Sequence, residues 1–143
     1  MRIGKTTPND YPAIVHIWAS SVKATHHFLK EEDFLFFQEV IPAEYLPQLE
    51  VYLLDDKGPK AFIAVAGDSL EMLFVAGEER GRGYGKVLLQ FAINELGVTR
   101  VDVNEQNEQA VGFYNRMGFV QTGRSAVDGT GRPYPIIHMA IRG

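Results

Sequence analysis

The stretch Glu79-Arg80-Gly81-Arg82-Gly83-Tyr84-Gly85-Lys86 decides how this chain is interpreted. The apolar run Met72–Val75 before it is typical of a buried strand, and residues 87–96 after it carry apolar side chains at helical spacing. The glycine-rich stretch therefore joins a strand to the start of a helix. Its glycines let the backbone approach a ligand closely, and a helix start offers unpaired N–H groups to an anion. Because arginine and lysine add positive charge, we expect a phosphate or pyrophosphate site here.

Two common phosphate-binding motifs do not fit this stretch. A Walker A loop needs a glycine at position 80 and a hydroxyl at position 87, where the chain has Arg80 and Val87. The dinucleotide motif GxGxxG, counted from Gly81, needs a glycine at position 86 and finds Lys86. The sequence Arg80-x-x-Gly83-x-Gly85 instead resembles the R/Q-x-x-G-x-G/A motif of the GNAT N-acetyltransferases. In that family the backbone amides of the loop bind the pyrophosphate of acetyl-coenzyme A (acetyl-CoA).

A second segment, Asn107–Phe119, supports the same resemblance. It is similar to the GNAT pattern N-x-x-A-x-x-F-Y-x-x-x-G-F, which in the family follows the strand after the pyrophosphate helix. Both motifs occur in the family's order and spacing, and the resemblance extends over essentially the whole chain. From its sequence, the chain is identified as a member of the GNAT family.

The overall composition favours a single domain that covers residues 1–143. Hydrophobic residues make up 45% of the chain, enough for a sizeable core. The net charge of −4 disfavours nucleic acid as a partner. The chain has no cysteine, which fits a reducing compartment. Since neither a signal peptide nor a membrane span is apparent, we expect a cytoplasmic protein that does not bind membranes.

The pattern of elements predicts an α+β (mixed α/β) fold. Helices are expected at residues 7–23, 31–45, from the glycine-rich loop to 96, and 107–117. Strands are expected at residues 2–6, 51–54, 61–66, 69–76, 99–104, 119–127 and 132–141. The resemblance implies that these form a mostly antiparallel, seven-stranded mixed sheet flanked by about four helices. It also implies that the sheet is splayed open between strands 69–76 and 99–104.

The resemblance implies that acetyl-CoA binds in this opening as a co-substrate. Its pantetheine arm would pair with the backbone of Leu73, Phe74 and Val75, as a further strand does. Its pyrophosphate would lie on the amides of residues 80–86, and Asn107 would hold the pantetheine arm. We expect no metal site.

Acetyl transfer to an amine requires a neutral amine, a stabilised oxyanion and a proton for the departing thiolate. The resemblance makes Tyr114 the general acid, because a phenol at this family position faces the thioester sulfur. The alternative is that Tyr114 only packs on its helix with Ala110 and Met117. A backbone N–H near Leu73 or Phe74 is the donor that the family implies for the oxyanion.

Three alternatives remain for the base that deprotonates the acceptor. Many family members carry a glutamate at the position of Ser69, and the period of two predicts that Glu71 faces the same way. His26 is a second alternative, since a histidine titrates near neutral pH. Water is the third. We interpret His138, which falls in a predicted strand, as structural.

The connection between the first two helices borders the acceptor side in this family. We therefore expect His26, His27 and Phe28 to contribute to substrate binding.

These observations predict an acetyl-CoA-dependent N-acetyltransferase that transfers acetyl directly to a primary amine in a ternary complex. The acceptor is a small-molecule or peptide amine, and the protein is a monomer or homodimer. The alternative is a non-catalytic GNAT module that binds acetyl-CoA as a sensor or partner protein. Tyr114 argues against that alternative, because a protein that only binds acetyl-CoA needs no acid.

Overall fold

A computed structural model of the chain describes residues 1–141. Its α-helices are α1 (Tyr11–Thr25), α2 (Glu31–Val40), α3 (Tyr84–Leu96) and α4 (Glu108–Arg116). Its strands are β1 (Arg2–Lys5), β2 (Glu50–Asp55), β3 (Pro59–Ala66), β4 (Ser69–Val75), β5 (Arg100–Asn104), β6 (Phe119–Ser125) and β7 (Ile136–Ile141). The predicted α+β class and the predicted sequence of helices and strands are confirmed.

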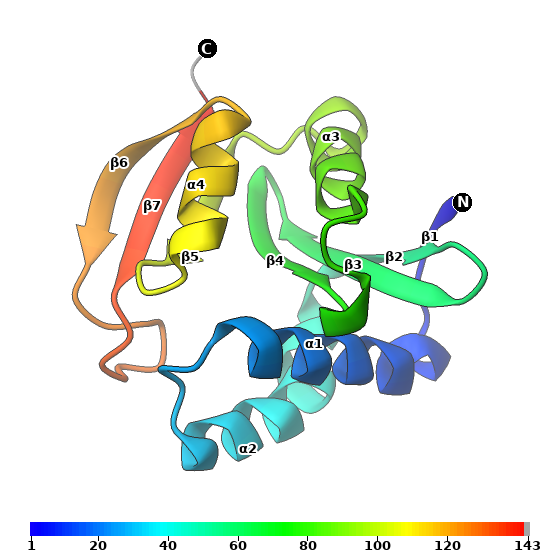
Figure 1. The fold of residues 1–143 in the computed structure, drawn as a ribbon, viewed down its shortest axis with the longest axis horizontal. Coiled ribbons are helices and arrows are strands. Elements are labelled where there is room, and N and C mark those ends of the chain that lie inside the picture. The colour runs from blue at the N-terminus through cyan, green and yellow to red at the C-terminus, as the bar shows by residue number, and fades with distance from the viewer. Residues whose placement is uncertain (142–143) are drawn as a thin grey trace.

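The strands form one seven-stranded sheet in the order β1-β2-β3-β4-β5-β7-β6. Neighbouring strands are antiparallel except for β4 and β5, which run parallel. The β4–β5 ladder holds only the pairs Ser69–Arg100 and Leu70–Val101, and beyond them the two strands diverge (Figure 1). The predicted opening in the sheet is therefore present.

Each face of the sheet has its own hydrophobic core. Helices α3 and α4 cover one face, where Leu88, Leu89 and Tyr114 are buried against the sheet. Helix α1 covers the other face with Ile14 and Trp18, and α2 packs beside it (Figure 1). A fully buried leucine contributes about 1.5–3 kcal/mol to stability, so these cores fix the helices on both sides of the opening.

The first two helices differ in detail from the prediction. Residues Pro8–Asp10 form a 3₁₀ turn, and α1 begins at Tyr11 and continues to Thr25. Helix α2 ends at Val40, and Ile41–Tyr45 forms a π-helical turn. Proline at position 42 explains this change, because it has no N–H to donate within an α-helix.

The last hairpin is also shorter than predicted. The carboxylate of Asp128 accepts hydrogen bonds from the N–H groups of Thr130 and Arg132, both at 2.9 Å, and so holds a wide turn. Pro133 and Pro135 lie in this turn and lack the N–H that a paired strand needs. Strand β7 therefore begins only at Ile136.

None of the helices in residues 1–141 has both the length and the hydropathy needed to cross a bilayer.

Candidate active site

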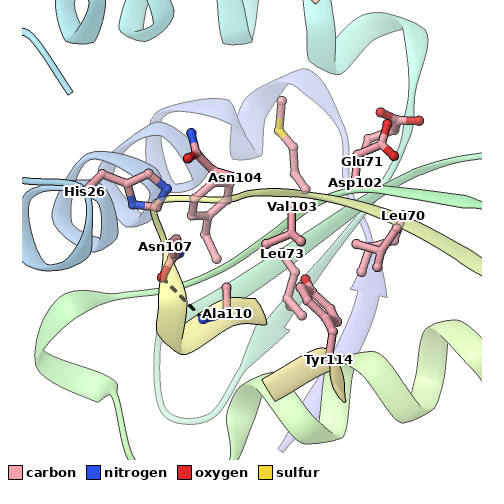
Figure 2. Close-up of a pocket in the computed structure, with 13 residues that line it drawn as sticks. His26, Leu70, Glu71, Leu73, Asp102, Val103, Asn104, Asn107, Ala110 and Tyr114 are labelled. Atoms are coloured by element: carbon pink, nitrogen blue, oxygen red, sulfur yellow. Dashed lines mark hydrogen bonds between the residues drawn. The ribbon is translucent and has the colours of Figure 1, made fainter. Parts of the chain in front are cut away.

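The opening between β4 and β5 contains a cavity of about 200 Å³ (Figure 2). It is lined by Leu73 on β4, Val103 on β5 and Tyr114 on α4. A larger hollow of about 510 Å³ lies against the glycine-rich loop. The two cavities share the lining residues His26, Leu73, Phe74, Asn107, Ala110 and Tyr114. Together they connect the loop to the interior of the opening.

The glycine-rich loop is held in a shape that suits a bound anion. Gly81 and Gly83 have φ angles of 81° and 85°, which side chains other than glycine adopt only with strain. No atom lies within 4 Å of the position that a Cβ would occupy at either residue. The backbone amides of the loop are therefore accessible to a ligand of the size of a phosphate.

The first turn of α3 adds further donors. The N–H of Val87 donates to the carbonyl of Gly83 at 3.1 Å, so the amides of residues 84–86 precede the intrahelical bonds. The side chain of Tyr84 is buried, and its hydroxyl donates to Asp56 at 2.8 Å. Tyr84 therefore offers its backbone, and not its phenol, to the larger cavity.

The positively charged side chains around the loop fall into two groups: those paired within the protein and those that line the larger cavity. Glu79 accepts a hydrogen bond from Lys60 at 3.1 Å and lies 3.3 Å from the guanidinium of Arg82. Arg82 is thus paired, and it is not among the residues that line the larger cavity. Arg80, which donates to Gln109, and Lys86 do line it. They are the positively charged side chains of the loop that face the larger cavity.

Asn107 occupies the position that the family motif implies. It caps the N-terminus of α4, with its side-chain oxygen accepting from the Ala110 amide at 3.3 Å. Figure 2 shows this bond at the edge of the cavity. Since the cap uses the oxygen, the side-chain nitrogen is the atom that remains for a ligand.

Tyr114 is buried between the two cavities. Its side chain is 6% exposed and packs against Phe113 and Phe119, with ring centroids 5.2 Å and 5.8 Å away. Its hydroxyl forms no hydrogen bond with residues 1–141 and points into the cavity (Figure 2). Burial raises the pKa of Tyr114 well above its usual value, because the phenolate would be poorly solvated. The phenol therefore carries its proton throughout the neutral range.

His26 lines both cavities, but its environment suppresses protonation. Burial, and then the charge of His27, lower the pKa of His26 to about 4. Its Nδ1 lies 2.6 Å from the Thr25 hydroxyl, and its ring lies 6.2 Å from that of Phe74. At neutral pH His26 is an uncharged imidazole, which is a weak proton acceptor.

The other two residues of this connection lie outside both cavities. His27 is exposed, and Phe28 packs between His26 and Tyr134 at ring distances of 5.1 Å and 6.1 Å. Phe28 thus packs against the ring of His26 without lining either cavity.

Glu71 lines the smaller cavity, although the strand that carries it is irregular. Between Ala64 and Val65 the partner on β4 changes from Met72 to Leu70, so Glu71 is the extra residue of a bulge. Simple alternation from Ser69 does not hold across a bulge, so the period of two was not a sound basis for the direction of Glu71.

Sequence reasoning missed Asp102 on β5, which also lines the smaller cavity. Its neighbours Val101 and Val103 are buried on the α4 face, so alternation places Asp102 on the opposite face. An aspartate between two buried valines was the sequence signal that could have identified this position. Within the described residues, no group of three potential metal ligands occurs.

Comparison with known proteins agrees with this geometry. Residues 37–139 match the family model described as "Acetyltransferase (GNAT) domain". The chain belongs to the GNAT acetyltransferase family, and it is an acyltransferase enzyme.

Among curated relatives, it is 40% identical over 128 residues to "Peptidyl-lysine N-acetyltransferase YjaB" of Salmonella typhimurium, covering 88% of each chain. Among solved structures, it matches the solution structure of apo YjaB from Escherichia coli with a TM-score of 0.89 and 36% identity, covering 100% and 99% of the two chains. The PaiA N-acetyltransferase of Thermoplasma acidophilum, solved in complex with coenzyme A, shares the fold with a TM-score of 0.77, at 20% identity and with 99% and 98% of the chains covered.

Proposed function

We propose that this enzyme transfers the acetyl group of acetyl-CoA directly to a primary amine in a ternary complex. The observation that carries the proposal is the hydroxyl of the buried Tyr114 side chain, which faces the cavity and has no partner among the described residues. An unpaired hydroxyl that opens onto a cavity can hydrogen-bond a group that binds there. The thiolate of departing coenzyme A is such a partner.

The residues around the opening suit acetyl-CoA. The pyrophosphate would lie on the amides of residues 80–86, with Arg80 and Lys86 supplying positive charge. The pantetheine arm would pass between β4 and β5, along Leu73, Phe74 and Val75, with Asn107 contacting it from α4. The coenzyme A bound to the related PaiA fold supports this choice of co-substrate.

In the proposed reaction, Tyr114 is the general acid. Breaking the thioester C–S bond leaves a thiolate, which takes the phenolic proton of Tyr114. Tyr114 is therefore protonated at neutral pH when the thiolate forms, and the phenolate that the transfer leaves regains its proton from solvent. On the acceptor side, Glu71, His26 or water removes a proton from the amine. With a pKa of about 4, His26 is better suited to hydrogen-bond the acceptor than to hold its proton.

We propose that the acceptor is the side-chain amine of a lysine in a peptide or protein. The name of the Salmonella typhimurium relative, a peptidyl-lysine N-acetyltransferase 40% identical to this chain, supports a peptide over a small-molecule amine. We further propose that residues 1–143 form one catalytic domain, active in the cytoplasm as a monomer or homodimer, without a metal, nucleic acid or membrane.

The test measures coenzyme A release from acetyl-CoA with a thiol reagent. Because the chain has no cysteine, the reagent detects only the released coenzyme A. A panel of lysine peptides, polyamines, amino acids and aminoglycosides supplies the acceptor. We expect release with lysine peptides. Tight binding of acetyl-CoA without release above background for any acceptor would contradict the proposal.

A further inference from the structure

Three polar side chains from neighbouring strands form a Ser-His-Asp cluster on the face of the sheet opposite α4. Nε2 of His138 on β7 lies 2.7 Å from the hydroxyl of Ser125 on β6, and Nδ1 lies 2.6 Å from Oδ1 of Asp102 on β5. A hydroxyl within reach of a base that a third group orients is the arrangement that activates a serine. Neither Ser125 nor His138 lines either cavity, so the cluster is distinct from the site described above.

The carboxylate determines which nitrogen of the imidazole carries the proton. An ionised carboxylate only accepts hydrogen bonds, so Nδ1 of His138 donates to Asp102. In a neutral imidazole the other nitrogen then accepts, so the Ser125 hydroxyl donates to Nε2. His138 is thus placed to take the proton of Ser125, which is the role of a general base.

A bulge in β6 places Ser125 on the same face as His138. Phe119, the first residue of β6, is buried in the core under α4. Strict alternation would direct Ser125, an even number of residues further on, to that same buried face. The register shifts between Gln121 and Gly123, and Gly123 then pairs with His138. Bulges that redirect a side chain in this way are over-represented next to active sites.

A second hydroxyl–imidazole contact in the protein shows why the third group matters. The Thr25 hydroxyl lies 2.6 Å from Nδ1 of His26, but it donates to the carbonyl of Ser21 at 2.8 Å. A hydroxyl has one proton to donate, so Thr25 can only accept from His26. His26 therefore cannot take the proton of Thr25, whereas His138 can take that of Ser125.

The Ser-His-Asp cluster is open to a ligand. The side chains of His138 and Asp102 are 37% and 49% exposed, and Ser125 is half-buried. A Cβ on Gly123 would lie 3.6 Å from Cδ2 of His138, so the glycine leaves the edge of the imidazole uncovered. Because β6 is an edge strand, N–H groups on its outer side have no ladder partner and can bind an oxyanion. A carbonyl carbon can therefore approach the Ser125 hydroxyl from solvent.

We propose that Ser125 is a nucleophile that accepts acyl groups from small esters, with His138 as its general base and Asp102 as the positioning residue for the imidazole. This activity goes beyond the proposed N-acetyltransferase function and does not depend on it. The exposure of the cluster favours small esters with a good leaving group, such as aryl acetates, over substrates that need an enclosed pocket. His138, interpreted from its strand position as structural, becomes a catalytic residue.

The reaction needs only the ester, the cluster and water. The Ser125 oxygen forms a bond to the ester carbonyl carbon while its proton passes to Nε2 of His138. The C–O bond to the alcohol then breaks, and the alcohol leaves with that proton. Water attacks the acyl-serine by the same route, which releases the carboxylic acid and restores the Ser125 hydroxyl.

An alkyl fluorophosphonate tests the nucleophile, because an activated serine forms an O–P bond with it and displaces fluoride. Peptide mapping by mass spectrometry locates the label among Ser20, Ser21, Ser69 and Ser125, the serines of the chain. We expect labelling of Ser125 at a rate roughly 100-fold above that in His138→Gln, the usual contribution of a general base. Glutamine retains hydrogen-bonding groups but cannot take up the proton. An unlabelled Ser125 in the unmodified protein, or equal rates in the two proteins, would overturn the proposal.

Asp102→Asn tests the positioning role. Asparagine can turn its N–H group toward the imidazole, which moves the ring proton from Nδ1 to Nε2 and removes the base. We expect nitrogen NMR of His138 to show this move and labelling of Ser125 to slow roughly 100-fold. The matched control is Glu105→Gln, which alters a carboxylate paired with Arg124 and should change neither measurement. An unchanged proton position or an unchanged rate in Asp102→Asn would show that Asp102 does not position His138.

The acyl step is tested with 4-nitrophenyl acetate, which releases a coloured phenolate. We expect an acetyl group on Ser125, detected by mass spectrometry after an acid quench, and its loss in His138→Gln. Ser125→Ala should abolish this part of the phenolate release and leave coenzyme A release with a lysine peptide unchanged. Absence of acetyl-Ser125 in the unmodified protein would overturn the ester activity. Because this assay contains neither coenzyme A nor an amine, its outcome is independent of the proposed N-acetyltransferase function.

Discussion

The two sides of the opening in the sheet are built from different parts of the chain. On the cofactor side, the ligand would meet backbone: a loop with positive φ angles and the first turn of α3. On the acceptor side, it would meet side chains from distant segments. At the contact between α2 and the β6–β7 turn, which the proposed function assigns to the acceptor side, Asp33 accepts from Arg132 at 2.8 Å and from Tyr134. The guanidinium of Arg132 lies 4.0 Å from the ring centre of Phe36.

This difference explains why the cofactor site can be recognised from a sequence motif and the acceptor site cannot. A site built from backbone must place glycine at fixed positions, so it leaves a local motif. A site built from side chains needs only that its members meet in the fold, and Asp33 lies 99 and 101 residues from its two partners. Acceptor choice can therefore change by substitution of single residues while the cofactor motif stays constant.

Tyr114 gives the sharpest test of this division, because it lines the cavities on both sides. Replacement of Tyr114 by phenylalanine removes only the hydroxyl, so we expect kcat to fall roughly 10²-fold or more, the usual contribution of a general acid. The affinity for acetyl-CoA, measured by calorimetry, should barely change.

The control is Tyr52→Phe, which removes a phenol that packs on Phe91 away from both cavities. It should leave kcat unchanged. A Tyr114→Phe enzyme that loses affinity and stability in proportion to kcat would show that the phenol is a packing residue.

His26 tests the acceptor side through its dependence on pH. The folded protein holds the pKa of His26 at about 4, whereas an unfolded histidine titrates near 6.5. Between these values the unfolded chain binds more protons, so stability falls as the pH falls. We expect the free energy of unfolding to drop, between pH 7 and pH 5, by on the order of 2 kcal/mol more in the unmodified protein than in His26→Leu.

Urea unfolding at the two pH values measures this difference, and the other titrating groups cancel because both proteins share them. The same drop in both proteins would mean that His26 is solvated in the folded protein.

Gly83 tests the cofactor side. Alanine at this residue has space for its Cβ but must adopt a φ angle of 85°, at a cost of about 1 kcal/mol. We expect the loop to change shape and the affinity for acetyl-CoA to fall about fivefold. Calorimetry measures the affinity, and thermal unfolding measures the strain.

Gly67 provides a control that also has a positive φ angle, 60° in the β3–β4 turn, and also has space for a Cβ. Gly67→Ala should lose similar stability and keep its affinity for acetyl-CoA. If both alanine variants bound acetyl-CoA equally well, the loop would not be the pyrophosphate site.

The smallest expected effect concerns the contacts between α2 and the β6–β7 turn. Arg132→Lys keeps the charge near Asp33 but loses the planar stacking on Phe36. We expect a KM for the acceptor that is a few-fold higher and an unchanged KM for acetyl-CoA. An equal change in both KM values, from steady-state kinetics with each substrate varied in turn, would show that the two sides are not independent.

The same contacts should weaken in acid. Hydrogen bonds from Tyr134 and Arg132 hold the pKa of Asp33 below its usual value. Their contribution is present above about pH 4 and is lost as the pH falls through the lower folded pKa.

Much of the fold could be predicted because its signals are local. The apolar spacing after the glycine-rich loop predicted α3, and the run at 61–66 predicted β3. The error in α2 came where Pro42 alters the backbone. The bulge at Glu71 removes the basis for applying the period of two along β4. Neither effect is visible from hydrophobic periodicity.

The candidate site divides in the same way. Tyr114 and Asn107 follow from a motif, whereas the pairing of Asp102 with His138 depends on strand register. Register is set by the whole sheet and by the wide turn before β7, so the two residues could not be paired from their spacing along the chain. Periodicity alone could have placed Asp102 on the face of the sheet opposite α4.

The short parallel ladder between β4 and β5 has a consequence for the unfolding of the protein. Two residue pairs join strands β1–β4 to strands β5–β7, and we expect these two antiparallel units to open with different free energies. A ligand bound in the opening contacts both units, so it raises the free energy of unfolding either unit alone. Hydrogen exchange in the free enzyme should therefore show two distinct protection levels, and saturation with acetyl-CoA should merge them into a single cooperative transition.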